Sequence, residues 1–466
     1  MLTEREESYR VLLLWQKEGA FIKESGLSPF AMELALGVCR RHLYLEYFIK
    51  TLTKKMPSLE VKTILEMGLF QMFFMDVPDH AAINTSVEIA KAANLGDGAA
   101  RLVNAVLRSA RRTGEPALPP QRVRRVSIEN SVPEWLVRRW FDIYGADAAE
   151  AMAKSTLERP VEWIRVNTQK SSAPVVAQKI GLHGASILYD RYIELPRDVG
   201  VKLLLALPEF VKGEFSFQNP SAFEVVKLLD LKPGLKVWDA CAAPGGKSAL
   251  MAEMDSSLEI TASDSSAARL EKMQDLMTRL GLTNVKTECI DVVASDVDSR
   301  SFDSARSASL RMTRAPKIAD AATSAPLSSL VSRLSSDSSP LSSLVCSQPK
   351  AGVLSSKFDR ILLDVPCSNM GVIARRPESV YRITPESVKE LSELQFKILE
   401  NASRFLAEGG RLVYATCSPD PMETTQVINR FIKAHPEFVK AGDAVLPGKN
   451  DPRLDGFFAQ ALEYKK

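Results

Sequence analysis

Two Cys-Ser pairs stand directly after apolar segments that read as buried strands. Cys367 lies in LLDVPCSNMGVIARRPE (362–378), and Cys417 lies in LVYATCSPDPMETTQVI (412–428). A lone cysteine is usually a small apolar core residue. These two differ because both follow the carboxyl end of a strand, the edge at which parallel sheets bind ligands. They are therefore candidates for nucleophilic or acid–base chemistry.

A glycine turn is the strongest single signal in the chain. In VWDACAAPGGKSALM (237–251), a strand is expected to end at Asp239 and a helix to follow Gly245 and Gly246. Glycines let the backbone approach a ligand closely, and a helix N-terminus favours negative groups. The turn is not a phosphate-binding Walker A loop, because Cys241 stands where that motif needs glycine. It is not G-x-G-x-x-G either.

Acidic residues end the next two expected strands. Asp264 closes LEITASD, at close to the ~20-residue spacing after the turn that suits a carboxylate on ribose hydroxyls. Asp291 closes VKTECID. An aspartate at such a place often only caps the following helix. Two of them beside a glycine turn favour a pocket for a nucleoside.

The elements that position these residues alternate between strands and helices from residue 216 onward. Expected strands are LKVWDA, LEITASD, VKTECID, FDRILLD, GGRLVYAT and GFFAQALEY. Near-continuous apolar strands separated by helices predict a parallel, doubly wound sheet, with the last strand as an antiparallel edge. The helix in SVKELSELQFKILENASRFLAEG is expected to end at Gly409-Gly410.

The rest of the chain has a different character. Residues 1–113 carry apolar residues at helical spacing and predict a helix bundle, whereas 128–215 mix short strands and helices. Residues 295–356 hold 19 serines and no Glu, Tyr or Trp. Such a segment buries little apolar surface, so we expect a disordered insertion. A length of 466 residues fits about three domains of ~150 residues.

Composition excludes several classes of protein. No apolar run approaches the ~18 residues that span a bilayer, and MLTEREESYR is no signal peptide. Six cysteines without a C-x-x-C pair argue against a zinc ribbon, an iron–sulfur cluster or a disulfide framework. The formal charge of the whole chain is only +3, but residues 101–127 contain seven arginines and one acid. This stretch resembles a linker, and its positive charge suits contact with phosphates. We expect a cytoplasmic protein with no membrane contact and no metal.

Three motifs together resemble the RNA cytosine-5 methyltransferases of the Nol1/Nop2/Sun family: DACAAPGGKS, LLDVPCS-x-x-GVIARRPE and YATCSP-x-x-E-x-x-x-V-I. The N-terminal ILEMGLFQMFFMDVPDHAAINTSVEIAKAAN and RLVNAVLRSARR are similar to the NusB-type domain of its small-subunit rRNA (Sun/Fmu) members. RPVEWIRVNT (159–168) is similar to their small RNA-recognition-like subdomain. The resemblance implies an all-α NusB-like domain (1–125), a small α/β subdomain (126–215) and a Rossmann-like class I methyltransferase core (216–466). It covers the chain except 295–356.

The resemblance also implies roles for particular residues. S-adenosylmethionine would lie against the turn formed by Cys241, Ala242, Ala243, Pro244, Gly245, Gly246 and Lys247. Asp264 matches the ribose-binding acid, Asp291 the acid near adenine, and Asp364 the acid beside the methyl donor and the target base. Cys417 matches the nucleophile and Cys367 the residue that assists product release, while Lys247 matches the motif lysine. The sequence departs from the family pattern at Trp238, and IARRPESVYR lacks its His-Pro-Asp.

The chemistry of cytosine explains these residue types. C5 is a poor nucleophile until a thiolate adds at C6. A modest lowering of a cysteine pKa supplies that thiolate, and a carboxyl group at the ring edge stabilises the developing charge. A second acid–base group then serves the release step. The target base must first be exposed or flipped.

The function expected is therefore S-adenosylmethionine-dependent methylation of cytosine C5 in small-subunit (16S) ribosomal RNA by a monomeric enzyme. Arginines would contact RNA phosphates and position the RNA without reading its sequence: Arg108, Arg111, Arg112, Arg124, Arg125, Arg138, Arg139 and Arg165. Two alternatives stay open. The substrate is tRNA or another rRNA cytosine, or the protein is a non-catalytic RNA-binding or ribosome-assembly factor, which would need no paired thiols. A DNA cytosine-5 methyltransferase is a weaker option, because its nucleophile lies in the P-C motif.

Overall fold

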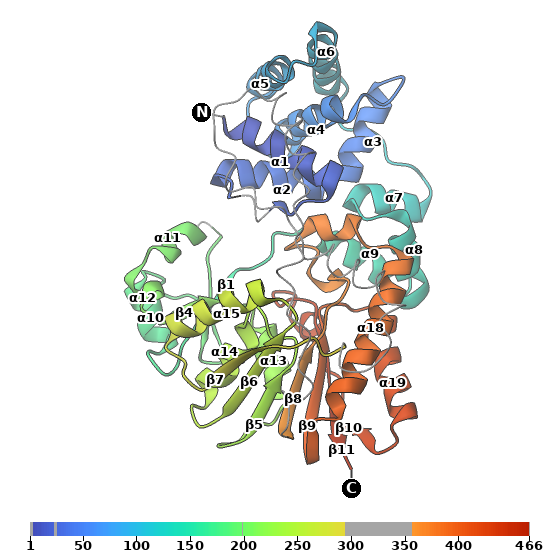
Figure 1. Ribbon diagram of the computed structural model, residues 1–466. Helices are drawn as coiled ribbons and strands as arrows, with labels where there is room; N and C mark the ends of the chain where they lie inside the picture. The colour runs from blue at the N-terminus through green and yellow to red at the C-terminus, as the bar shows by residue number, and fades with distance from the viewer. Residues whose placement is uncertain (1–2, 23–25, 198, 294–356, 466) are drawn as a thin grey trace. The chain divides into compact units, whose positions relative to one another are not determined.

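The computed structural model describes residues 3–22, 26–197, 199–293 and 357–465 (Figure 1). The Ser-rich segment 295–356 lies outside this part of the chain. The chain divides into two compact units. The first holds the chain up to Arg159 together with Ile373–Arg382, and the second holds the remaining described residues. The expected domain boundaries at 125 and 215 stay predictions.

The first unit is helical, as the periodicity of residues 1–113 predicts. Its helices are α1 (Glu4–Glu18), α2 (Pro29–Arg40), α3 (His42–Leu52), α4 (Leu59–Phe74), α5 (Asp79–Ala92), α6 (Asp97–Thr113), α7 (Arg122–Asn130), α8 (Glu134–Tyr144) and α9 (Ala146–Ser155). Thr3, Ser28 and Ser58 cap α1, α2 and α4 by accepting a hydrogen bond from a backbone N–H of the first turn. Only 114–121 separate α6 from α7, so most of the arginine-rich stretch is helical rather than linker.

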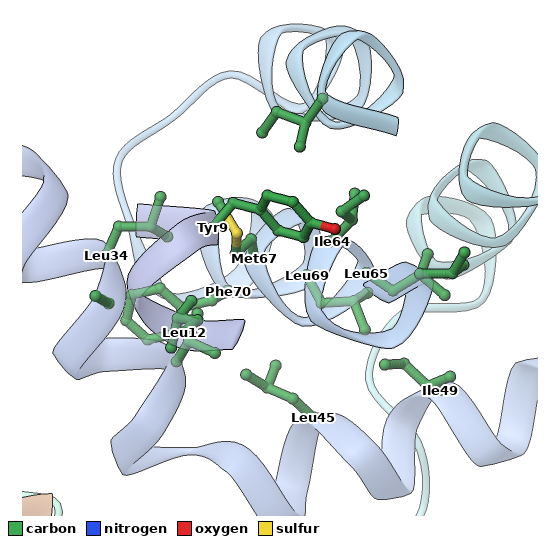
Figure 2. Close-up of a cluster of buried hydrophobic side chains, with 14 of the residues drawn as sticks. Tyr9, Leu12, Leu34, Leu45, Ile49, Ile64, Leu65, Met67, Leu69 and Phe70 are labelled. Carbon is green, nitrogen blue, oxygen red and sulfur yellow. The ribbon is translucent and has the colours of Figure 1, made fainter. Parts of the chain in front are cut away.

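The core of this unit surrounds α4. Figure 2 shows side chains of α1 to α4 meeting in one apolar cluster, including Leu12, Leu34 and Leu69. Helix α2 approaches α4 so closely that a Cβ on Gly37 would lie 2.0 Å from the ring of Phe70. A glycine is therefore required where these two helices cross.

A segment distant in sequence completes the helical unit. Residues Ile373–Arg382 include the 3₁₀ helix η4 (Pro377–Tyr381). The Tyr381 hydroxyl donates to the carbonyl oxygens of Cys39 and Ser131 at 3.1 and 3.0 Å, and its ring meets Trp15 edge-on. Buried hydrogen bonds and ring contacts of this kind fix a short segment that has little regular structure of its own.

The second unit begins with a small four-stranded sheet. Its strands are β1 (Trp163–Val166), β2 (Ile187–Leu188), β3 (Tyr192–Glu194) and β4 (Phe215–Phe217), in the order β2-β3-β1-β4 with antiparallel pairing throughout. Short helices α10 (Ala173–Lys179), α11 (Val201–Leu205) and α12 (Pro208–Val211) accompany it. Strand β1, which the alternation in VEWIRVNTQ predicts, is an interior strand of this sheet.

A seven-stranded sheet forms the body of the second unit. Its strands are β5 (Lys236–Asp239), β6 (Glu259–Asp264), β7 (Val285–Cys289), β8 (Phe358–Asp364), β9 (Leu406–Thr416), β10 (Phe438–Lys440) and β11 (Phe458–Tyr464). The order is β10-β11-β9-β8-β5-β6-β7, and β5 to β9 pair in parallel. The accompanying helices are α13 (Ser221–Lys227), α14 (Gly246–Met254), α15 (Ala267–Leu280), α18 (Pro385–Ser403), α19 (Thr425–Ala434) and α20 (Pro447–Asn450), with 3₁₀ helices η3 (Met370–Val372) and η5 (Pro421–Glu423).

Both faces of this sheet are buried, as the near-continuous apolar strands predict. Val237 and Leu362 belong to an apolar cluster with residues of α13, α14 and α15. The neighbouring Trp238 and Leu363 belong to a second cluster with residues of α18 and α19. Successive side chains of a strand point to opposite faces. The doubly wound, Rossmann-like fold is therefore confirmed.

Two local predictions are wrong. The closing strand β11 is antiparallel but is not the edge, because the short β10 pairs with its outer side. The helix α18 ends at Ser403, and Gly409-Gly410 lies inside β9. Gly409 adopts a left-handed φ of 71°. The β8–β9 pairing shifts register there, as at a β-bulge, which is a second use of glycine besides ending a helix.

Candidate active site

The glycine turn joins β5 to α14 as predicted. Gly245 has φ +97°, and a Cβ there would lie 2.6 Å from Met273 Cγ, so the turn needs glycine for both backbone and space. At the end of β5, Asp239 is buried, and Ser248 donates to its Oδ2 at 2.6 Å. Its Oδ1 has no hydrogen-bond partner among the described residues. Burial raises the pKa of Asp239 to about 7, partly opposed by the bond from Ser248.

The acids on the next strands lie at the same edge of the sheet. Asp264 accepts the backbone N–H of Ser266 at 2.9 Å and the Arg269 guanidinium at 2.5 Å. Burial raises the pKa of Asp264, and Arg269 opposes the shift. Arg269 also donates to the carbonyl oxygen of Ala243 at 2.7 Å, which links the acid to the turn. Asp291 follows β7 and accepts the backbone N–H of Val293 at 3.0 Å.

The two candidate catalytic cysteines meet. Cys367 follows β8 and Cys417 follows β9, and their sulfur atoms lie 2.9 Å apart. The Cys417 thiol also lies 3.1 Å from the Asn369 amide oxygen, which accepts its proton in a hydrogen bond. The backbone N–H of Gly371 donates to the Cys417 carbonyl oxygen at 2.8 Å. The turns after two adjacent parallel strands thus form one thiol site.

A buried glutamate connects the turns that carry Cys367 and Cys417. Glu423 accepts the Ser368 backbone N–H at 2.9 Å and the Ser368 hydroxyl at 2.5 Å, while Gln395 donates to it at 3.0 Å. The Ser368 and Ser418 hydroxyls lie 3.1 Å apart. Burial raises the pKa of Glu423 despite these donors. The serine beside each cysteine is therefore held by one network.

A lysine–carboxylate pair completes the site. Lys247 Nζ lies 2.5 Å from Asp364 Oδ2 and 4.7 Å from the centre of the Phe457 ring. Burial would lower the pKa of Lys247, but the attraction of Asp364 outweighs it and the pKa is raised. Lys247 is therefore a cation beside an anion, next to the thiols. Since it is hydrogen-bonded to Asp364, its first effect is to fix that carboxylate.

The pKa of Cys417 is shifted in the direction opposite to the modest lowering that gives a thiolate at neutral pH. The pKa of Cys417 is raised well above its usual range, first by its hydrogen-bonded contact with Cys367 and then by burial. Asp364 adds to the shift by repelling the thiolate. Burial likewise raises the pKa of Cys241 in the glycine turn. In this state of the protein, Cys417 is therefore held as a thiol.

Most of the arginines expected at RNA are on the surface. Arg108, Arg111, Arg112 and Arg124 are exposed on α6 and α7, and Arg125 is half-buried. Some already have partners: Arg111 lies 3.1 Å from Asp79, and Arg125 lies 3.7 Å from Glu150. Exposed pairs of this kind contribute little energy and exchange readily.

The expectation for Arg165 is wrong. Its side chain is 1% exposed, and its guanidinium forms a two-point pair with Glu253 of α14. A phosphate cannot reach this group. The sequence shows that residue 165 is a cation. Its burial depends on the pairing with Glu253, which lies 88 positions away in the chain.

Three further residues belong to this site and have weaker signals in the sequence: Arg269, Asn369 and Glu423. Glu423 is marked by its place in the YATCSP-x-x-E motif. Asn369 has a left-handed φ of 61°, a conformation that asparagine tolerates better than most residues. Arg269 offers no such signal, because an arginine near the start of an amphipathic helix is usually solvated.

One group of described residues has metal-ligating atoms close together, in the helical unit: His42, Glu46 and Glu66. Lys62 lies 2.8 Å from Glu46 and 3.9 Å from Glu66, so an ammonium already neutralises these carboxylates. We assign no metal to this group. Among the described helices, none has the length and apolar character needed to cross a bilayer.

A parallel sheet with a glycine turn after β5, acids at the ends of β6 and β7 and a reactive edge beyond β8 is the architecture of class I S-adenosylmethionine-dependent methyltransferases. Family models match in three parts: "16S rRNA methyltransferase RsmB/F" over 226–307 and 315–450, the NusB family over 5–112, and the RsmF/B-like ferredoxin-like domain over 132–189. The chain belongs to the RsmB/F methyltransferase family.

Individual relatives agree with this assignment. The probable ribosomal RNA small subunit methyltransferase B of Bacillus subtilis is 32% identical, covering 99% of this chain and 96% of its own. The small subunit methyltransferase B of Shewanella oneidensis is 30% identical over 80% of this chain and 73% of its own. The crystal structure of PH0851 shares the fold with a TM-score of 0.72 and 20% identity, covering 100% and 99% of the two chains. NSun6 from Pyrococcus horikoshii, solved with SFG, has a TM-score of 0.52 at 20% identity over 72% and 98%.

Proposed function

We propose that this chain methylates C5 of a cytosine in small-subunit ribosomal RNA, with S-adenosylmethionine as donor and Cys417 as nucleophile. The observation that carries the proposal is the pair of thiols, 2.9 Å apart, at a sheet edge that also holds the Lys247–Asp364 pair. Two thiols with a carboxylate beside them suit a reaction that needs addition, charge stabilisation and release.

The residues present fit S-adenosylmethionine. The glycine turn brings backbone within reach of a ligand, and the first turn of α14 leaves N–H groups without an intrahelical partner. Asp264 and Asp291 offer carboxylate oxygens to ribose hydroxyls and to the adenine edge, roles we assign to them here. When bound, the cofactor supplies an electrophilic methyl group.

The thiols would act in sequence. The Cys417 thiol would give its proton to solvent, and its sulfur would bond to C6 while the electrons of the C5–C6 double bond move toward C5. C5 would then take the methyl group as the methyl–sulfur bond of the donor breaks and its electron pair stays on the donor sulfur. The C5 proton then leaves to a base, the double bond reforms, and the C6–sulfur bond breaks with its electrons returning to Cys417. Asp364 is positioned by Lys247 to hydrogen-bond the ring edge, and Cys367 assists the release step.

RNA would meet the helical unit through α6 and α7. Arg108, Arg112 and Arg124 are exposed there, and phosphate contact by such groups positions RNA without reading its sequence. Arg111 and Arg125 would exchange an exposed carboxylate for a phosphate. The target cytosine must leave its stack to reach the thiols, at a cost of a few kcal/mol.

The alternative substrate is a tRNA cytosine, and the alternative class is a non-catalytic RNA-binding factor. The paired thiols speak against the second, because simple RNA binding requires no such pair. The test is to incubate the protein with labelled S-adenosylmethionine and unmodified small-subunit rRNA or tRNA, then map 5-methylcytosine. We expect one rRNA position to be modified, and Cys417→Ala to abolish modification while Cys39→Ala does not. Undiminished methylation by Cys417→Ala would sink the nucleophile assignment, and modification of tRNA alone would change the substrate.

A further inference from the structure

Arg165 is buried on an interior strand of the small sheet, and all three nitrogens of its guanidinium group donate hydrogen bonds. Its Nε and Nη2 donate to the two carboxylate oxygens of Glu253 at 2.9 and 2.8 Å. Its Nη1 donates to the Gly246 carbonyl oxygen at 2.8 Å and to the Gln218 amide oxygen. One guanidinium thus joins the small sheet to both ends of α14.

Stability alone does not explain this arrangement. A buried ion pair contributes little compared with apolar residues of the same volume, because removing both charges from water is costly. Arginine is distinguished by a planar fork of donors that fixes the direction of several acceptors at once. The acceptor that matters here is the Gly246 carbonyl, because Gly246 belongs to the turn at the expected cofactor site.

The hydrogen bond that orients the Gly246 carbonyl also orients a backbone donor, the Lys247 N–H. The Gly246 carbonyl and the Lys247 N–H belong to one planar peptide unit, so the orientation of one sets the orientation of the other. The Lys247 N–H is in the first turn of α14, where N–H groups are directed toward a ligand. Gln218 packs closely against Gly246, since a Cβ on Gly246 would lie 2.9 Å from the Gln218 amide nitrogen. The Tyr192 hydroxyl in turn donates to Gln218 at 3.0 Å.

We propose that Arg165, paired with Glu253, is a positioning residue that holds the Gly246–Lys247 peptide in the orientation needed to bind S-adenosylmethionine. The segment similar to an RNA-recognition subdomain thereby serves the cofactor site from inside the protein. This inference rests on the proposed function, since it assumes that the turn binds that cofactor.

A neighbouring residue provides a matched control. Gln169, four positions after Arg165, donates to the carbonyl oxygen of Ala252 at 2.7 Å. It therefore links the same segment to the same helix, but at the end away from the turn. Gln169→Ala tests the loss of a docking contact without the loss of the Gly246 contact.

The experiment is calorimetric titration of the full-length chain with S-adenosylhomocysteine, together with the melting temperature of each variant. Arg165→Met combined with Glu253→Met removes both charges and leaves neither unpaired. We expect it to melt within about 5 °C of the wild type, with a Kd for S-adenosylhomocysteine raised about tenfold. Arg165→Lys, which keeps the charge but loses the fork, should be intermediate, and Gln169→Ala should bind as the wild type does. Steady-state kinetics should show a raised KM for S-adenosylmethionine and an unchanged KM for RNA.

Two results would overturn the inference. One is an unchanged Kd in the double variant, or in Arg165→Lys if the double variant does not fold. The other is weaker RNA binding with reduced salt dependence in the Arg165→Met/Glu253→Met variant, which would make Arg165 an RNA contact. A wild-type protein that does not bind S-adenosylhomocysteine would instead count against the proposed function.

Discussion

The sulfur atoms of Cys367 and Cys417 lie 2.9 Å apart although fifty residues separate them in the chain. Strand register explains the closeness. Strands β8 and β9 pair in parallel with Asp364 opposite Ala415, so the turns that follow them emerge side by side. Both thiols therefore lie at one edge of the sheet, as the proposed reaction requires, in which one thiol adds and the other assists release.

Replacing Cys367 with alanine should trap the reaction after methyl transfer. Without the group that assists release, the C6–sulfur bond to Cys417 persists, because the methylated adduct cannot expel the thiolate efficiently. We expect a protein–RNA adduct that survives denaturing electrophoresis. The Cys367→Ala/Cys417→Ala double variant should form no adduct. Normal turnover by Cys367→Ala would show that the second thiol is dispensable for release.

The alkylation of Cys417 should increase steeply with pH. Its pKa is raised well above the usual range by the contact with Cys367 and by burial, and only the thiolate reacts with iodoacetamide. In the absence of RNA and cofactor, we expect the rate to rise about tenfold per pH unit through neutrality. Cys367→Ala should accelerate alkylation at a fixed pH, since it removes the largest cause of the shift.

Mass spectrometry of the peptide containing Cys417 measures this rate. Cys39, which is buried in the helical unit with a pKa also raised by burial, is the internal control and should stay unmodified. A fast reaction at neutral pH that no longer depends on pH would contradict the raised pKa.

The glutamate behind the thiols should tolerate an amide but not truncation. Glu423→Gln can keep its bonds by turning the new NH₂ toward the Ser368 hydroxyl, which can accept. Because burial raises the pKa of Glu423, a neutral group suits the site. We expect activity within about threefold of the wild type. Glu423→Ala leaves the Ser368 N–H and the Gln395 amide without their acceptor and should cost about 3 kcal/mol of stability.

The two variants are compared by urea denaturation and by methylation rate. Glu423→Ala should also lower kcat by about a hundredfold or more, because the two Cys-Ser turns lose the glutamate that connects them. Equal rates in Glu423→Ala and Glu423→Gln would mean that the network does not position the thiols.

The buried carboxyl group of Asp239 should make stability depend on pH. Its pKa is raised from 3.8 to about 7 in the folded protein, chiefly by burial. The folded state thus holds a proton that the unfolded state releases, so this contribution is complete below pH 3.8 and is lost as the pH rises through about 7. Relative to Asp239→Asn, the free energy of unfolding should fall by about 3 kcal/mol from about pH 5 to about pH 8.

Urea denaturation at each pH measures this difference for the apo protein. Asp255→Asn is a suitable control, because that carboxylate is only half-buried and hydrogen bonds from Ser257 lower its pKa. Curves for the wild type and Asp239→Asn that run parallel across this range would show that Asp239 ionises normally.

The main architecture could be predicted from the sequence because its signals are local. Strands buried on both faces contain continuous apolar runs, as Leu412–Ala415 of β9 do, and the glycine turn carries its own spacing. The structure departs from prediction where distant residues decide. The sequence around Arg165 suggests a surface cation, because the partner that allows its burial, Glu253, is distant in the chain. Strand β10 is three residues long, which is too short to show a strand periodicity. The pKa of Cys417 depends on a thiol from another strand, which no local pattern encodes.

The helical unit is interrupted in the sequence, since Ile373–Arg382 belongs to it. A ribosome synthesises residues in order, so the first nine helices leave the exit tunnel long before the segment that bears Tyr381 does. During that interval, the carbonyl groups of Cys39 and Ser131 lack the hydroxyl that later bonds them. The first unit to be started is therefore completed only after residues 160–372 of the second unit's part of the chain have been synthesised.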